Sequence, residues 1–527
     1  MTTGIKKTGF ILILLTLHFF LPVAGYSDEI EQNIPHKNLT EKLVIFQTTD
    51  IHSYFTGKEC GWLNLAQMIH SEREKAGGND KTLLIDCGDT LNGSPEAFIS
   101  RGQAGVNMLN VMNYDAWIPG NHDLEFSPGK FSALRNKIKA DTIAANLFFT
   151  DSSPALQKWK LYRKKGLKIA VIGLTSPYIK EWLWGRKIKH IQVKKMIDSV
   201  AHTMPDVLKN NPDFIILAVH HGLYAPPRLG GMKLARIAER FPAINLILGG
   251  HSHQLVPGEK CGPASWFVQS GCHAEYFAKI AVTFDKTTKK IKNISSELIP
   301  VTAQKKINPT FIKAGSLWMT AANALQKKNI GSTLLPVTPP DKNSFSGTMD
   351  ELFRLAVAEQ TDADIVFHGC VSYSAKFAGA ITEKEIFAAI PYDDTVCTLL
   401  LTPDEIRKVI NEQLNNRQND KYSRFQPPLG LTAVIDKSMH VAGVTDENGT
   451  PLVPDRKYKC AFSSYILAGA GGRFPVLKKL AASAATRPED SGVLVRDALR
   501  NYIAAHSPLN IKKVTRIIPA EKTDTKK

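Results

Sequence analysis

The sequence has little cysteine and, beyond its first residues, no long apolar run. Seven cysteines among 527 residues do not make a disulfide scaffold, and their odd number leaves at least one thiol free. Cys261 and Cys272 are close in sequence and able to pair in an oxidising compartment, whereas two separate buried thiols fit the sequence equally well. No apolar stretch after residue 25 reaches the roughly 20 residues of a transmembrane helix, so we expect no stable membrane anchor.

Signals of nucleic-acid binding are also missing. The chain has no zinc-finger spacing, and the basic residues behind its net charge of +17 are scattered in short clusters such as 186–187 and 194–195. We therefore expect no nucleic-acid polymer as a partner, and the charge favours a small anionic substrate. Internal repeats are absent as well, and a chain of this length is expected to form two or three domains.

The N-terminal residues have the features of a secretory signal. Lys6 and Lys7 precede an apolar run over residues 9–23, and a polar stretch follows. This order predicts a signal peptide over residues 1–25 and a periplasmic or secreted mature protein. No cysteine follows the apolar run closely, so we expect no lipid anchor.

Five short apolar runs in the first half of the chain each lead into a polar cluster. They cover residues 43–46, 83–85, 116–118, 214–219 and 244–248. Runs of this length, bounded by glycine and aspartate, are typical of buried strands, and helix-like stretches such as 63–76 and 196–209 lie between them. A further apolar run, 168–173, leads into no ligand-type residue and is expected in the sheet core. The alternation predicts an α/β domain whose functional residues follow the strand ends.

The second half of the chain alternates between helices and strands again. A helical stretch over 311–328 and the proline-rich residues 335–340 predict an interdomain helix and a linker. Residues 331–519 then predict a second α/β domain, in which 469–472 form a glycine-rich turn, and 520–527 form a polar tail.

The polar clusters after the five runs supply carboxylate, imidazole and amide side chains. These are Asp50, His52, Asp89, Asn121, His220, His251 and His253. Such ligands suit two borderline or hard divalent cations that share one carboxylate. A single histidine after a strand is more often a satisfied polar residue, and Gly-Asp is usually only a turn. Five clusters at the same edge of the fold favour a metal centre instead.

The order of these motifs resembles that of a known enzyme family. D-x-H at 50–52, G-D at 88–89, G-N-H-D at 120–123, H-x-G at 220–222 and G-G-H-S-H at 249–253 follow one another as in the calcineurin-like metallophosphoesterases. The closest resemblance is to the family of 5'-nucleotidases, UDP-sugar hydrolases and 2',3'-cyclic-nucleotide 2'-phosphodiesterases, over about residues 42–480. It implies an αββα sandwich over 42–300, an interdomain helix over 301–330 and an α/β substrate-binding domain over 331–519.

The resemblance also implies roles for individual residues. Asp50, His52, Asp89 and His253 would bind one divalent metal ion, such as Zn or Mn, and Asp89 would bridge to a second ion held by Asn121, His220 and His251. Such a pair polarises phosphoryl oxygens and lowers the pKa of water. His122 would stabilise the transition state and act as general acid. The acidic partner of His122 is often aspartate in relatives, whereas here it is Glu125, whose side chain is one methylene longer. Asp123, directly after His122, is interpreted as structural.

The second domain departs from the family in its substrate-binding motifs. Relatives have an Asn-Gly-Gly-Gly-x-Arg segment at this place. Here His368 replaces the asparagine, which would contact the base, and Tyr373 replaces the arginine, which would contact phosphate. The usual Gly-Gly-Asp-Gly turn has Arg473 in place of the acid. We expect His368, Tyr392, Asp394, Tyr465 and Arg473 to bind substrate, although both tyrosines also fit a role as core aromatics and Arg473 fits a solvated turn.

Together these patterns predict an exported dinuclear-metal phosphohydrolase. The first expectation is a 5'-nucleotidase-type phosphomonoesterase that releases phosphate from nucleotides. A 2',3'-cyclic-nucleotide phosphodiesterase/3'-nucleotidase or a UDP-sugar hydrolase is the alternative, because the same bimetallic core serves both reactions. Farther alternatives are a sulfur-ester hydrolase and a periplasmic binding protein without catalysis, and the complete set of seven ligands argues against the last of these.

Overall fold

The computed structural model describes residues 39–55, 60–150, 156–341, 344–419 and 428–520. The predicted signal peptide and the tail from residue 521 lie outside this part of the chain. Within it, none of the helices has both the length and the apolar character needed to cross a membrane.

The first half of the chain forms two six-stranded sheets. In order across the first sheet, the strands are β14 (Ile291–Pro300), β13 (Tyr276–Asp285), β1 (Thr40–Thr48), β2 (Thr82–Asp86), β3 (Ala116–Trp117) and β4 (Asp141–Thr142). Across the second they are β11 (Leu255–Cys261), β12 (Ser265–Ser270), β10 (Leu246–Leu248), β9 (Phe214–Val219), β7 (Leu167–Leu174) and β6 (Trp159–Lys164). Apolar side chains of both sheets, among them Ile45 and Ile216, share one fully buried core.

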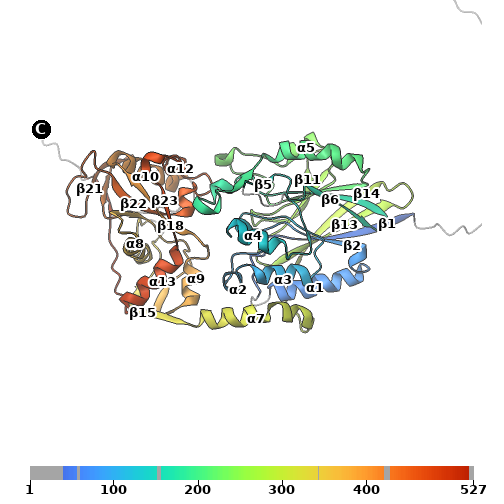
Figure 1. Cartoon of the computed structure of the whole chain (residues 1–527), viewed down its shortest axis with the longest axis horizontal. Helices are drawn as coiled ribbons and strands as arrows, with labels where there is room; N and C mark the ends of the chain where they lie inside the picture. Colours follow the sequence, from blue (N-terminus) through green and yellow to red (C-terminus); the bar gives the residue numbers. More distant parts are fainter. Residues whose placement is uncertain (1–38, 56–59, 151–155, 342–343, 420–427, 521–527) are drawn as a thin grey trace, which may run out of the picture. The chain divides into compact units, whose positions relative to one another are not determined.

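Helices cover the outer face of each sheet. Those on the first sheet are α1 (Trp62–Lys75), α2 (Pro95–Ser100), α3 (Gln103–Val111) and α4 (Pro128–Arg135), and those on the second are α5 (Met196–Lys209) and α6 (Ala235–Arg240). Figure 1 shows α5 on one side of the sheets and α1 to α3 on the other. The predicted αββα sandwich is therefore confirmed, and α5 has the predicted bounds.

The sheet topology places the polar clusters at one edge. Strands β1, β2 and β3 are parallel, as are β7, β9 and β10, so the carboxyl ends within each set meet at the same side. The loops that follow β1 and β2 are joined by backbone hydrogen bonds, from Cys87 N to Thr48 O at 2.9 Å and from Asp50 N to Gly88 O at 2.8 Å. The chain therefore holds its ligand-type residues on short, mutually bonded loops.

A long helix precedes the second half of the chain, as predicted. It is α7 (Pro309–Gln326), and strand β15 (Asn329–Val337) follows and pairs with β17 (Phe377–Thr382). The predicted linker over 335–340 is wrong in its first part, because residues 335–337 complete β15. Pro336 is tolerated there because the pairing is irregular and two-stranded, and the buried Val337 pairs with Phe377.

The second half is a further α/β unit. Its five-stranded sheet has the order β19 (Pro428–Leu429), β16 (Ile365–Phe367), β22 (Tyr458–Ser463), β18 (Thr395–Leu401) and β23 (Glu489–Leu494). A three-stranded sheet of the same unit has the order β21 (Val441–Thr445), β20 (Thr432–Ile435) and β24 (Ile517–Pro519). The first half of the chain also contains a separate two-stranded sheet of β5 (Leu147–Phe149) and β8 (Ile191–Val193). The helices are α8 (Thr348–Thr361), α9 (Glu383–Ala389), α10 (Pro403–Asn419), α11 (Ser464–Leu467), α12 (Pro475–Ala481) and α13 (Val495–His506).

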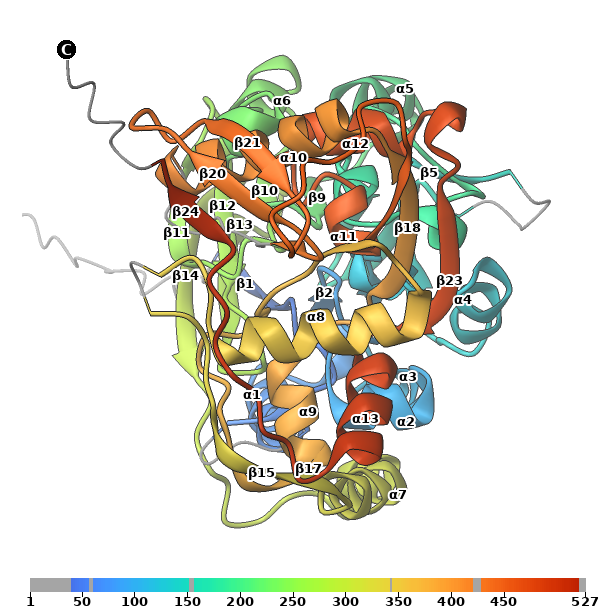
Figure 2. The same cartoon turned by 90° about the vertical axis from the view of Figure 1, so that its left-hand side faces the viewer.

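Two cores lie on opposite faces of the five-stranded sheet. One contains residues of α10 and α12, and the other contains residues of α8 and α13. In Figure 2, α10 and α12 lie above and α8 and α13 lie below. The two-domain α/β class predicted from the sequence is confirmed, whereas the residue bounds predicted for each domain stay a prediction.

The pairing of Cys261 with Cys272 is wrong. No disulfide forms among the seven cysteines, all of which lie in the described residues. Cys261 pairs with Ser265 at the closed end of the β11–β12 hairpin, and Leu255 pairs with Ser270 at its open end, next to Cys272. The hairpin separates the two thiols by about 17 Å at ~3.3 Å per residue, whereas a disulfide requires Cα atoms within ~7 Å.

Candidate metal centre and active site

The loops that carry the candidate ligands have an unusual backbone. Asp50, His52, Asp89, His251 and His253 all have positive φ, between 51° and 68°. Residues other than glycine rarely adopt this left-handed conformation, and where they do they often belong to functional sites whose surroundings hold them in place. Here the hydrogen bond from His52 N to Asp89 O, 2.8 Å, ties two of these loops together.

The first group of candidate ligands is Asp50, His52 and His253. Its ligand atoms lie within 4.8 Å of one another. His253 Nε2 lies 3.3 Å from His52 Nε2 and 3.4 Å from Asp50 Oδ1. His52 Nδ1 donates to the carbonyl of Asn92 at 2.9 Å, so the lone pair of the neutral ring is on Nε2, facing the group. Burial lowers the pKa of His52 to about 3, which keeps this ring neutral, as a metal ligand must be.

The second group is Asp89, His220 and His251. His220 Nδ1 donates to the carbonyl of Cys87 at 2.7 Å, and its Nε2 faces Asp89 Oδ2 at 3.1 Å and Asn121 Oδ1 at 3.2 Å. A nitrogen that faces two acceptor oxygens needs either a proton or a cation between them. The donor set of imidazole nitrogens, carboxylate and amide oxygens therefore fits a divalent cation here and another at the first group.

The glycines of the motifs leave room for the ligands. A Cβ at Gly120 would lie 2.2 Å from Asp89 Oδ1, one at Gly250 would lie 2.3 Å from Thr49 Oγ1, and one at Gly88 would lie 2.8 Å from His220 Nδ1. Each distance is shorter than any real Cβ contact. The glycine in G-D, G-N-H-D and G-G-H-S-H is therefore required by the close approach of ligand-bearing loops.

His122 lies beside the two groups and is held by Glu125. Its Nδ1 is 2.7 Å from Glu125 Oε1, and the other carboxylate oxygen, Oε2, accepts from Asn92 Nδ2 at 2.6 Å. Burial lowers the pKa of His122, but the attraction of Glu125 and Asp89 outweighs burial and raises it to about 9. The extra methylene of Glu125 thus does not prevent the contact expected of a dyad.

Asp123 has a different role from its neighbour His122. Its carboxylate accepts from the backbone N–H groups of residues 89, 90, 91 and 120, at 2.7 to 3.0 Å. With every oxygen occupied by backbone donors, Asp123 orders the loops of the site, which agrees with the structural role expected from the sequence.

A cavity of about 490 Å³ opens onto these groups and continues into the second half of the chain. Its lining includes the candidate substrate residues His368, Tyr392, Asp394, Tyr465 and Arg473 as well as Asp89, Asn121, His122, Glu125, His251 and His253. This volume suits a ligand of nucleotide size. Tyr373, which stands where relatives have an arginine, does not line the cavity, and its side chain is exposed.

Comparison with known proteins agrees with this geometry. Residues 43–255 match the family described as calcineurin-like phosphoesterase, and residues 333–479 match the 5'-nucleotidase C-terminal domain. The chain belongs to the 5'-nucleotidase family. It is thus a metallophosphoesterase, a hydrolase.

Relatives of this family match over most of the chain. Protein UshA of Escherichia coli (strain K12) is 25% identical over 529 residues, which cover 90% of this chain and 92% of the relative. The 5'-nucleotidase of Vibrio cholerae is 24% identical over 537 residues, covering 90% and 92%. The fold matches that of a 5'-nucleotidase precursor from Thermus thermophilus, with a TM-score of 0.67 at 18% identity over 92% of this chain and all of that one. It also matches the sulfate thiohydrolase SoxB of Thermus thermophilus, with a TM-score of 0.61 at 17% identity over 91% and 97%.

Among the candidate substrate residues, Tyr392 contacts His122. Its ring stacks on His122, with centroids 5.5 Å apart and planes 14° apart, and 44% of the residue is exposed. The interpretation of Tyr392 as a core aromatic is therefore wrong. Tyr465 lines the cavity but also packs against a core of the second domain, so it combines both expected environments.

His368 and Arg473 are held by other protein groups. His368 is buried, stacks on Phe353 with centroids 5.4 Å apart and faces the carbonyl of Gly369, 3.1 Å from its Nδ1. Burial lowers the pKa of His368 to about 4, so the ring is neutral. Arg473 donates from Nη1 to the carbonyl of Ala470 at 2.9 Å. It is a cavity-lining residue rather than a fully solvated turn residue.

Three residues near the site were not predicted from the sequence. Asn92 links the first ligand group to the dyad, because its carbonyl holds His52 and its amide holds Glu125. Trp182 lines the cavity, with its ring edge-on to His251 at 4.6 Å between centroids. Lys187 donates to the carbonyl of Asp393. None lies in a recognisable motif, and only the folded chain brings them to the site.

Proposed function

We propose that the protein is an exported, dinuclear-metal phosphomonoesterase that hydrolyses nucleotides to nucleosides and inorganic phosphate. One observation carries the proposal: a single cavity is lined by members of both groups of candidate metal ligands, by the His122–Glu125 pair and by an exposed aromatic ring. Family membership supports nucleotides as the substrate class. The predicted signal peptide supports export to the periplasm or the medium.

The assigned ligands have two tasks. Asp50, His52 and His253 would hold one divalent cation, and Asn121, His220 and His251 would hold the second, with Asp89 shared between them. When bound, the two cations would polarise the phosphoryl oxygens and lower the pKa of a water, which supplies the nucleophile. The protein contributes the loops that carry the ligands, and the backbone carbonyls of Asn92 and Cys87 accept from His52 and His220 and so orient these two rings.

His122 would act on the leaving group. Water adds to phosphorus, the ester P–O bond breaks, and the departing alkoxide of the nucleoside takes the proton that His122 carries. Glu125 favours the protonated imidazole and fixes its tautomer, and Asn92 orients Glu125 in turn. The ring of Tyr392, stacked on His122, gives the acid a defined orientation at the cavity wall.

The second domain would bind the rest of the nucleotide. Tyr392 and Tyr465 offer aromatic surface for a base, and Asp394 and His368 offer polar contacts from the cavity wall. Arg473 would contact an anionic part of the substrate.

A diesterase, acting on 2',3'-cyclic nucleotides or on UDP-sugars, is the second candidate. Among the lining residues of the described chain, Arg473 is the only arginine or lysine, because Tyr373 replaces the usual arginine and lies outside the cavity. The phosphate of a 2',3'-cyclic nucleotide bears one negative charge, against two for a phosphomonoester dianion, so it depends less on an arginine or lysine side chain beside the proposed metal ions.

A substrate panel on the mature protein distinguishes these activities. Loss of substrate and formation of each hydrolysis product are measured by chromatography for AMP, UDP-glucose, 2',3'-cyclic AMP, a thiosulfate ester and p-nitrophenyl phosphate, each at equal concentration. We expect AMP to have the highest kcat/KM. Preference for the cyclic nucleotide or the nucleotide sugar would establish the second candidate. Turnover of the sulfur ester alone, or tight nucleotide binding without turnover, would overturn both.

A further inference from the structure

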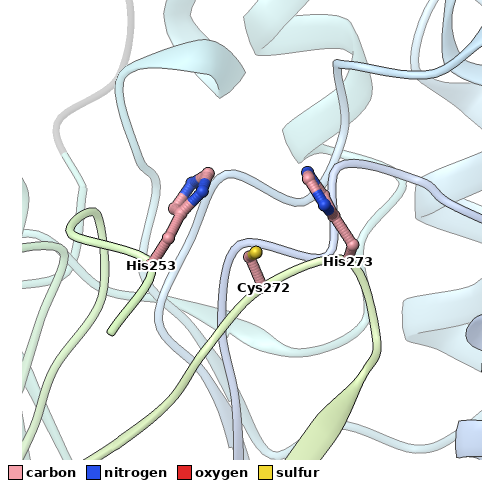
Figure 3. A group of neighbouring side chains, drawn as sticks. All are labelled: His253, Cys272 and His273. Carbon is pink, nitrogen blue, oxygen red and sulfur yellow. The ribbon is translucent and has the colours of Figure 1, made fainter. Parts of the chain in front are cut away.

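A third group of metal-binding side chains adjoins the proposed catalytic centre. It consists of His253, Cys272 and His273, whose ligand atoms lie within 4.8 Å of one another. Figure 3 shows the Cys272 sulfur between the two imidazole rings, with all three side chains projecting the same way from their loops. Cys272 and His273 have no part in the proposed reaction.

The backbone holds this group in place. Cys272 and His273 follow β12, and the amide of His273 donates to the carbonyl of Asp50 at 2.8 Å, which ties their loop to the loop after β1. The His273 ring lies 4.3 Å from that of Tyr54 and 5.6 Å from that of His253, between centroids. The group is therefore part of the ordered site.

The donor atoms suit a thiophilic cation. Zinc binds cysteine sulfur at ~2.3 Å and histidine nitrogen at ~2.0–2.1 Å, so tetrahedral ligands lie about 3.3–3.8 Å apart. The three donor atoms lie within 4.8 Å of one another, so each pair would have to shorten by at most about 1.5 Å to reach that spacing. Two imidazoles and a thiolate favour Zn²⁺ or a softer ion, whereas the carboxylate of the Asp50 group also accepts harder ions. His253 is 39% exposed, which leaves a route for an ion from solvent.

His253 belongs to two groups at once. A neutral imidazole has one lone pair, so His253 can bind a cation either with Asp50 and His52 or with Cys272 and His273. We propose that His253, Cys272 and His273 form an alternative site for a thiophilic divalent cation, which removes His253 from the catalytic position and so inhibits the enzyme. Occupancy of this site would make activity depend on which metal is in excess.

Cadmium provides the probe, because a cadmium–thiolate bond absorbs in the near ultraviolet. Mature protein is stripped of metal, loaded with Mn²⁺ and titrated with Cd²⁺ in a reductant without thiols. We expect a charge-transfer band that saturates at one Cd²⁺ per chain and is lost in Cys272→Ser. His273→Asn should weaken Cd²⁺ binding by roughly 10-fold or more, the scale of losses at metal-site partners. Cys60→Ser, which changes the other half-buried cysteine, should keep both band and affinity.

A second arm measures inhibition. Cd²⁺ should inhibit hydrolysis of p-nitrophenyl phosphate by the Mn²⁺-loaded protein, and Cys272→Ser should resist it while its activity with Mn²⁺ alone stays unchanged. The band persisting in Cys272→Ser, or unchanged affinity in a folded His273→Asn variant, would overturn the site. Cd²⁺ binding through Cys272 without inhibition would overturn the sharing of His253. The absorption arm requires no turnover, so it decides the site even if the proposed function fails.

Discussion

Replacing Glu125 by glutamine should move the alkaline limb of the pH–rate profile to lower pH. A general acid must be protonated, so activity is lost as the pH rises through its pKa. Glu125 is the partner that raises the pKa of His122 and survives metal binding, because the charge of Asp89, the other raising influence, would be committed to the cations. Glu125→Gln keeps the hydrogen-bonding shape but removes the charge.

The magnitude follows from the distance between the two groups. At the 2.7 Å that separates His122 Nδ1 from Glu125 Oε1, unit charges attract by ~1.5 kcal/mol even at the dielectric constant of water, and by ~6 kcal/mol at an effective constant of about 20. The smaller figure already corresponds to about one pKa unit. Both side chains are mostly buried, 19% and 8% exposed, so water does not cancel the interaction.

The assay is the pH dependence of kcat/KM for a nucleotide, measured with wild type, Glu125→Gln and the charge-conserving control Glu125→Asp. We expect the alkaline limb of Glu125→Gln to lie at least about one pH unit below that of wild type. The aspartate variant should keep the limb near its original position and lose rate only through its shorter reach. An unmoved limb in Glu125→Gln would refute His122 as a general acid tuned by this carboxylate.

Three further substitutions test separate parts of the site. Asp89→Ala should abolish hydrolysis and lower metal occupancy at both positions, because one carboxylate serves two cations; elemental analysis that finds two metals per mutant chain contradicts this. His122→Ala should lose roughly 10²–10⁴-fold in kcat for AMP yet keep both metals, and lose less with p-nitrophenyl phosphate, whose phenolate leaves without a proton. Loss of metal in this variant would instead make His122 a ligand. Arg473→Ala should raise KM for the preferred nucleotide far more than KM for p-nitrophenyl phosphate, and equal effects on both would exclude Arg473 as a specificity contact.

Local patterns in the sequence were sufficient to predict the scaffold of the first domain. The bounds of α5 and β9 agree with the predicted stretches, because helical periodicity and short apolar runs are properties of neighbouring residues. The linker over 335–340 was misjudged for a different reason. Proline argues against a strand locally, but residues 335–337 finish β15, where pairing with β17 compensates.

The candidate metal ligands were predictable because motif glycines and ligands are adjacent in sequence. Trp182 was not, since it lies in no motif and meets His251 only through the fold. Asn92 was missed because it binds His52 through its backbone carbonyl, a group that any residue carries. The sequence predicts Cys272 either as a disulfide partner or as a separate buried thiol. Its place between His253 and His273 depends on how the loop after β12 meets the loop after β10.

The central claim is that hydrolysis requires two metal ions at the Asp50 and Asp89 groups. It is tested most directly by removing all metal from the mature protein with a chelator and returning Mn²⁺ stepwise, with metal content and phosphate release from a nucleotide measured at each step. We expect no turnover in the stripped protein and full turnover only as the second equivalent per chain binds. Turnover that survives complete metal removal, or that is complete with one ion per chain, would contradict it.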